Sequence, residues 1–218
     1  MKKIMFNDRY DLTLKVLNGQ KTQTRREAYR MPLQYEHRVG SEDGHLILLD
    51  GWCRVAKSAY RVGEEVAIAQ RYSELSWDKD FYDKLCSRCE RLPQQELAGW
   101  DNKMFVCSED MPHRIRIKSI KVERIQDISE EDCLAEGLDD DCGEGIHPYW
   151  WHIDQKKHTD WREISDELAR HGFDRHGKPC TYFWETAQSA YKALIDRLDK
   201  TMWKRNPWVF VYDFELIK

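Results

Sequence analysis

The sequence predicts an α+β fold, in which a small mixed β-barrel carries peripheral helices and surface insertions. Two runs in which apolar and polar residues alternate predict long strands, one around residues 115–122 and one at 208–217. Apolar residues that recur at the spacing of one helical face predict a helix over 187–198. The predicted order is strand, helix, several strands, helix, helix and final strand, which fits such a barrel.

The first elements are a short strand at Ile4–Phe6 and a helix over Asp8–Leu17. The buried face of this helix is expected to carry Tyr10, Leu14 and Leu17. Asn18 and Gly19 are residues that commonly end a helix, so the chain is expected to leave it there.

The middle of the chain contains two predicted strands, His45–Asp50 and the buried run Val66–Ala69. Ser129 is a good N-cap and three acidic residues follow it, which predicts the start of a short helix that ends at Gly137. Asn206-Pro207 interrupts the pattern before the final strand.

The charge distribution bears on the class of partner. The formal net charge is -4, whereas a protein that coats a long nucleic-acid duplex usually carries a large positive surplus. Basic residues gather locally in Lys21–Arg30 and His113–Arg124, so a nucleic-acid contact would be local; solvated surface faces are the alternative. The nine Trp and ten Tyr supply either core or surfaces on which bases can stack.

The expected location is the cytoplasm. The first residues contain no apolar run of the length a signal peptide needs, and no stretch approaches the roughly 20 apolar residues of a membrane span. The seven cysteines are scattered and odd in number, which favours reduced thiols.

Gly19-Gln20-Lys21-Thr22-Gln23-Thr24-Arg25-Arg26 resembles the signature of the activating-signal-cointegrator homology (ASCH) domains, a branch of the PUA-like superfamily. Three further segments agree with this family in the same order, and the last has the form seen in bacterial and phage members. They are Val62–Val66, Val122–Gly137 and Trp203–Glu215.

The resemblance implies one ASCH/PUA-like domain over residues 1–218. It does not cover three stretches, which are expected to be insertions at about 27–60, 73–112 and 139–185. Gln70-Arg71 is a departure, because relatives often have an Arg-Glu pair there, so a charged partner is expected to be missing.

Two kinds of function follow from the resemblance. Many PUA-like domains bind RNA or a modified base, so the expected partner is RNA or a modified nucleoside held in a cleft near the motif. Some small ASCH proteins are amidohydrolases that act on N4-acylated cytidine, and a ribonuclease activity is also attributed to the family. A protein-interaction module is the third alternative, with the 139–180 region as its contact surface. No cofactor and no metal are expected.

The amidohydrolase residues of the family fall on Lys21, Thr24 and Glu136. Thr24 would be the nucleophile or hold the attacking water, Lys21 would be a base or an oxyanion stabiliser, and Glu136 would orient Lys21 or relay a proton. Arg26, Gly19 and Arg25 would contribute to ligand binding, with Arg26 as a planar fork for phosphate or carboxylate. The structural alternative is a simple ion pair between Lys21 and Glu136, with Thr24 as an ordinary strand residue.

Two further clusters have weaker signals. Cys86 and Cys89 have the spacing of half a zinc site, which Cys107 and His113 could complete, but unremarkable reduced thiols are the alternative. Five histidines in the third insertion suggest a metal site or a stacking surface; a polar loop with a few packed aromatic residues is the alternative. They are His147, His152, His158, His171 and His176.

Overall fold

A computed structural model of the chain describes residues 1–29, 36–76, 78–88, 97–140, 149–150 and 186–217. Its main element is a five-stranded sheet in the order β1-β6-β7-β10-β2. The strands are β1 (Lys2–Ile4), β2 (Gln23–Tyr29), β6 (Glu65–Ile68), β7 (Arg114–Arg124) and β10 (Trp208–Ile217). β1 runs parallel to β6, and the other neighbours are antiparallel.

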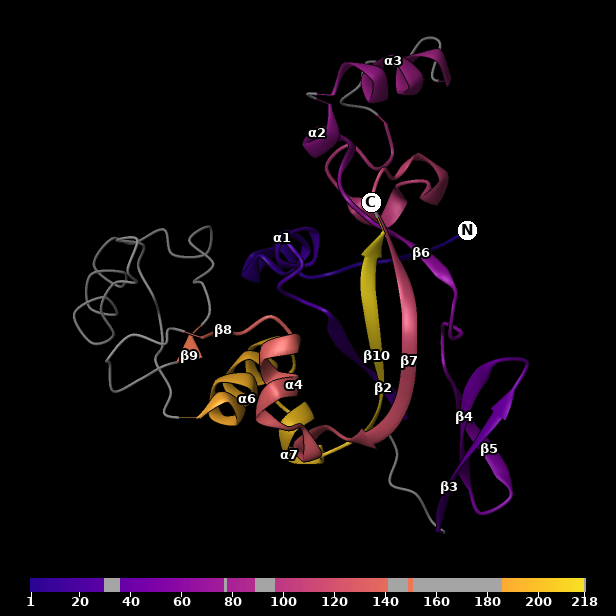
Figure 1. The fold of residues 1–218 in the computed structure, drawn as a ribbon, viewed down its shortest axis with the longest axis vertical. Helices are drawn as coiled ribbons and strands as arrows, with labels where there is room; N and C mark the ends of the chain where they lie inside the picture. Colours follow the sequence, from indigo (N-terminus) through magenta and orange to yellow (C-terminus); the bar gives the residue numbers. More distant parts are fainter. Residues whose placement is uncertain (30–35, 77, 89–96, 141–148, 151–185, 218) are drawn as a thin grey trace, which may run out of the picture.

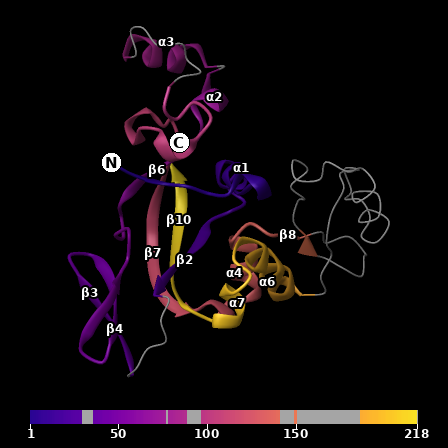
Figure 2. The ribbon, with the colours of Figure 1, turned by 180° about the vertical axis from the view of Figure 1, so that it is seen from behind.

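A second sheet, of order β3-β4-β5, is formed by His37–Glu42, His45–Asp50 and Cys53–Lys57. It lies on the opposite side of the five-stranded sheet from helices α4, α6 and α7 (Figures 1 and 2). These helices span Glu130–Ala135, Ala187–Leu198 and Met202–Arg205. Two short strands, β8 (Asp139–Asp140) and β9 (Tyr149–Trp150), pair beside them.

The described residues between β6 and β7 form short helices and irregular segments. They include α2 (Tyr72–Leu75), α3 (Lys79–Arg88), and the 3₁₀ turns Lys103–Phe105 and Ser108–Asp110. They have a small core of their own around Tyr72, Leu85 and Met111, and they lie at one end of the main sheet (Figure 1).

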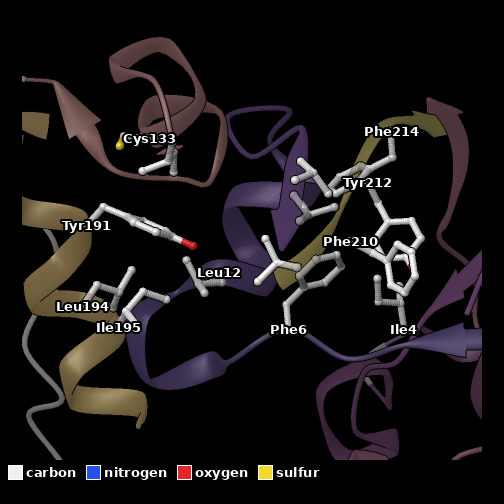
Figure 3. Close-up of a cluster of buried hydrophobic side chains, with 14 of the residues drawn as sticks. Ile4, Phe6, Leu12, Cys133, Tyr191, Leu194, Ile195, Phe210, Tyr212 and Phe214 are labelled. Atoms are coloured by element: carbon white, nitrogen blue, oxygen red, sulfur yellow. The ribbon is translucent and has the colours of Figure 1, made fainter. Parts of the chain in front are cut away.

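The main core covers both faces of the sheet, because buried Val209 and Val211 of β10 alternate with buried Phe210 and Tyr212, and Tyr212 packs against Tyr60. Figure 3 shows Tyr191, Leu194 and Ile195 of α6 together with Leu12 and Cys133, and the aromatic residues of β10 with Phe6 and Ile4. Burying such side chains contributes about 1.5–3 kcal/mol each and is the main source of stability. No helix within the described ranges is both long enough and apolar enough to cross a membrane.

The α+β class is confirmed, as are the long strands β7 and β10 and the helices α4 and α6. The predicted barrel does not close in the described part of the chain, where β1 and β2 are the outer strands of an open sheet. β1 has only three residues, and the chain then turns into a 3₁₀ turn at Asp8–Tyr10. It therefore ends before it can pair with β2.

The predicted N-terminal elements are partly wrong. The strand lies at Lys2–Ile4, before the predicted position, and the helix is split into the 3₁₀ turn and α1 (Leu12–Leu17) by Asp11 in a left-handed conformation. Leu14, expected in the core, is 53% exposed. Because the helix is broken, its buried face is set by Leu12 and Val16 instead.

Candidate functional site

The motif Gly19–Arg26 begins as a turn that connects three elements. Gly19 has φ +76°. The amides of Gln20 and Lys21 both donate to the carbonyl of Lys15, and these two hydrogen bonds close the end of α1. The amide of Thr22 donates to the Ala135 carbonyl at 2.9 Å, and its carbonyl accepts from Phe214. The turn is therefore held against the C-terminus of α4 and against β10.

After the turn, alternation along β2 sends its side chains to opposite faces of the sheet. Gln23 lies opposite Asp213 on β10, and the two side chains are hydrogen-bonded at 2.7 Å on the face that carries α4. Arg25 shares this face. Thr24 lies opposite Tyr212 and, like Arg26, belongs to the other face.

Lys21 and Glu136 meet in the interior. The Lys21 ammonium lies 2.6 Å from Oε2 of Glu136, and the two side chains are 1% and 8% exposed. Lys21 Nζ also donates to the carbonyl oxygens of Gln23 at 2.7 Å and of Glu136 at 2.6 Å. A cation beside the last carbonyls of α4 also stabilises the negative end of that helix.

Three acceptors around Nζ require three N–H donors, so the contacts fit a charged ammonium and not a neutral amine. Burial lowers the pKa of Lys21 below its ordinary value, and the Glu136 carboxylate opposes this effect only in part.

Arg25 is the centre of a wider ion-pair network. Its Nη2 donates to Glu123 and to Asp132, both at 2.7 Å, and its Nη1 lies 3.2 Å from Glu136. Burial disfavours the charged guanidinium, but the carboxylates of Glu136 and Glu123 outweigh it, so the pKa of Arg25 is raised. One planar fork therefore joins β2, β7 and α4.

Lys121 and Gln23 complete the network at its edge. Lys121 Nζ lies 2.8 Å from Asp132 and 3.1 Å from Glu123, and Gln23 donates to Asp132 at 2.9 Å. Burial disfavours the Asp132 carboxylate, but hydrogen bonds from Lys121 and Gln23 outweigh it and lower the pKa of Asp132. Three cations and three carboxylates thus satisfy one another on the face toward α4.

The structure brings two members of the expected trio together and separates the third. Lys21 and Glu136 form the buried pair, whereas Thr24 is 5% exposed and lies across β2 from Gln23 and Arg25. Among the described side chains, the Thr24 hydroxyl has no hydrogen bond to Lys21 or Glu136. A nucleophile placed here would not be activated by the pair in its present arrangement.

Arg26 reaches a pocket on the surface. The pocket has a volume of about 430 Å³ and is open to solvent. Among the described residues, Arg26 has a single hydrogen bond, from Nη2 to the Met5 carbonyl at 2.6 Å, and no ion pair with a carboxylate. The other lining residues are Met5, Phe6, Asn7, Asp8, Arg71, Lys103 and Leu198.

Asp8 links the other two cations of the pocket. Its carboxylate accepts from Lys103 at 2.6 Å, from the Thr13 hydroxyl at 2.6 Å and from Arg71 at 3.2 Å. Lys103 also contacts the Phe6 carbonyl and Thr13, so its ammonium is held by the wall of the pocket.

Sequence reasoning did not find Asp8, Arg71 or Lys103. The resemblance drew attention to Gln70-Arg71 only as a position where a charged partner would be missing, and the structure places Arg71 in the pocket. Lys103 is 95 residues from Asp8 and lies in an insertion, so no spacing signal joins them. Gly19 does not line the pocket; its role is the turn.

The cysteines and histidines considered as possible metal ligands do not converge within the described ranges. Cys86 lies in α3 and Cys107 directly before the 3₁₀ turn Ser108–Asp110, whereas Cys89 and all five histidines of the third insertion lie outside these ranges. Among the described residues, no three His, Cys, Asp or Glu side chains are arranged to hold a metal ion.

Comparison of the chain with protein-family models, with characterised proteins and with solved structures gives no match in any of the three.

Proposed function

We propose that this chain is a binding protein for a nucleotide-like ligand, either RNA or a modified nucleoside that carries a phosphate, held in the pocket beside Arg26. The proposal rests on the contacts that Arg26 makes. Its guanidinium lines an open pocket and, within the described part of the chain, meets a backbone carbonyl but no carboxylate. A planar fork with donors to spare is suited to a phosphate group.

The size and lining of the pocket agree with such a ligand. Pockets for small molecules are typically about 300–1,000 Å³ and mostly apolar, with a few polar groups that fix orientation. Here Met5, Phe6 and Leu198 offer apolar contact for a base, and the charged residues lie beside them. The pocket is local, which suits a chain whose net charge is -4.

The test is a binding assay with nucleotides and short single-stranded RNA, comparing the unaltered chain with Arg26→Ala. We expect Arg26→Ala to weaken binding at least about tenfold, the loss of one charge-assisted hydrogen-bonded contact. Arg54→Ala is the matched control, because Arg54 is an exposed arginine of β5 paired with Glu42 and does not line the pocket. Unchanged affinity in Arg26→Ala, or no binding of any nucleotide or RNA, would refute the proposal.

A hydrolase is the second candidate, favoured by the buried pair of Lys21 and Glu136. If this pair supports cleavage of N4-acylated cytidine, incubation with N4-acetylcytidine should release cytidine, and Glu136→Gln should abolish the release while the chain stays folded. Release that persists in Glu136→Gln would remove this role for the pair.

A further inference from the structure

The charges that line the Arg26 pocket add a constraint on the ligand. Three cations line it, Arg26, Arg71 and Lys103, against one carboxylate, that of Asp8. The Lys103 ammonium donates to the Asp8 carboxylate at 2.6 Å and is otherwise taken up by the Phe6 carbonyl and Thr13. The charges of Lys103 and Asp8 therefore cancel, and the remaining positive charges of the pocket are those of Arg26 and Arg71.

The contacts of Arg71 are weak enough to be exchanged for a ligand. It meets Asp8 and Glu74 at 3.2 Å each, and its side chain is 32% exposed. Ion pairs at this exposure contribute little to stability. Glu74 also accepts a hydrogen bond from the backbone amide of Arg71 at 3.0 Å, so it stays in place when the guanidinium turns toward the pocket.

We propose that the pocket selects a phosphate monoester, the terminal phosphate of a nucleotide, over an internal phosphodiester; this rests on the proposed function. A monoester carries a charge of about -1.5 to -2 near pH 7 and has three terminal oxygens. A diester carries one charge. Two arginines facing one pocket match the dianion in charge, and their planar forks can share its three terminal oxygens.

The volume of about 430 Å³ suits a single nucleotide rather than a run of several. Two ligands carry such a phosphate monoester: a free mononucleotide and the phosphorylated end of an RNA strand. Both present a terminal phosphate next to a base, and both can place the base against Met5, Phe6 and Leu198.

The experiment measures the affinity of the full chain for cytidine and adenosine 5′-monophosphates and for their methyl phosphate esters, which carry one charge less. We expect the monoesters to bind at least about tenfold tighter. A second pair, a short RNA with and without a 5′-phosphate, separates the two sources. Tighter binding of the RNA with a 5′-phosphate would show that the site also takes RNA ends. If only the mononucleotides show a preference for the monoester, the ligand is a free nucleotide.

Arg71→Gln tests the second fork. We expect it to weaken monoester binding more than diester binding and so to remove most of the preference for monoesters, with Arg54→Ala as the control. Equal affinity of monoester and methyl ester in the unaltered chain would overturn the inference but leave the proposed function standing. A chain that binds neither would overturn the proposed function itself.

Discussion

The ammonium of Lys21 and the carboxylate of Glu136 lie 2.6 Å apart, although 115 residues separate them in the sequence. The pair joins the turn before β2 to the end of α4. Its neighbours Arg25, Glu123 and Asp132 continue the connection to β7. These buried charges depend on one another, and four predictions follow from their geometry and from the turn at Gly137.

Replacing Lys21 by Met should destabilise the fold by about 3–5 kcal/mol, because it leaves the Glu136 carboxylate buried with one partner fewer. Adding Glu136→Leu should restore part of this loss, since both charges of the pair are then gone. Urea unfolding of both single variants and the double variant measures the coupling. Additive losses would show that the two side chains do not interact.

Replacing Arg25 by Lys should be nearly as damaging as replacing it by Ala. Arg25 bonds three carboxylates through separate nitrogens, and a single ammonium cannot reproduce that fork. We expect a loss of about 3–5 kcal/mol for Arg25→Ala, measured by chemical denaturation. The matched change Arg54→Ala, at an exposed site, should stay within about 0.5 kcal/mol. A mild effect of Arg25→Lys would argue against the fork.

Acid should weaken the fold partly through Asp132. The folded-state pKa of Asp132 lies below its ordinary value of 3.8, so its contribution to stability is present above that value and is lost as pH falls through the folded pKa. Asp132→Asn should therefore lower the free energy of unfolding at pH 7, and this deficit should shrink as pH falls below the ordinary value of 3.8 and through the folded-state pKa. Denaturation curves at several pH values test this, and a deficit that does not shrink in acid would contradict it.

Gly137 ends α4 with φ +98°, and its amide donates to the Leu134 carbonyl at 2.8 Å. An alanine in this left-handed region costs about 1–2 kcal/mol. A Cβ there would make ordinary contacts, 3.4 Å from Lys15 and Lys21, so we attribute the loss to the backbone and not to a clash. Thermal unfolding of Gly137→Ala gives the value. Replacing Gly44, at φ +77° in the β3–β4 turn, provides a comparison away from the network.

Local patterns predicted several of the main elements. β7, β10 and α6 have a clear period of two or 3.6, and Ser129 and Gly137 mark the ends of α4 through their own backbone chemistry. The first helix was predicted as one piece because its apolar spacing continues through Asp11. The left-handed conformation of Asp11 interrupts the helix, and the spacing of apolar residues does not record it.

The site could be predicted only in part. The resemblance at Lys21 pointed to Glu136, and the structure brings the two together. Alternation along β2 separates Thr24 from them, a consequence of strand register that the motif alone does not reveal. The pocket needed Arg71 and Lys103, which reach Arg26 from other parts of the chain. Tertiary packing brings these three side chains to one pocket, and the spacing of residues in the sequence does not predict it.

The open edge of the main sheet has a consequence for the range of ligands that the pocket can admit. Within the described residues no ladder of backbone hydrogen bonds joins β1 to β2, and the bond from Arg26 to the Met5 carbonyl crosses between the segment after β1 and β2. The distance across the pocket is therefore set by side-chain contacts. Phe6 is buried in the main core and Lys103 binds both the Phe6 carbonyl and Asp8, so this wall is anchored and limits the size of the ligand.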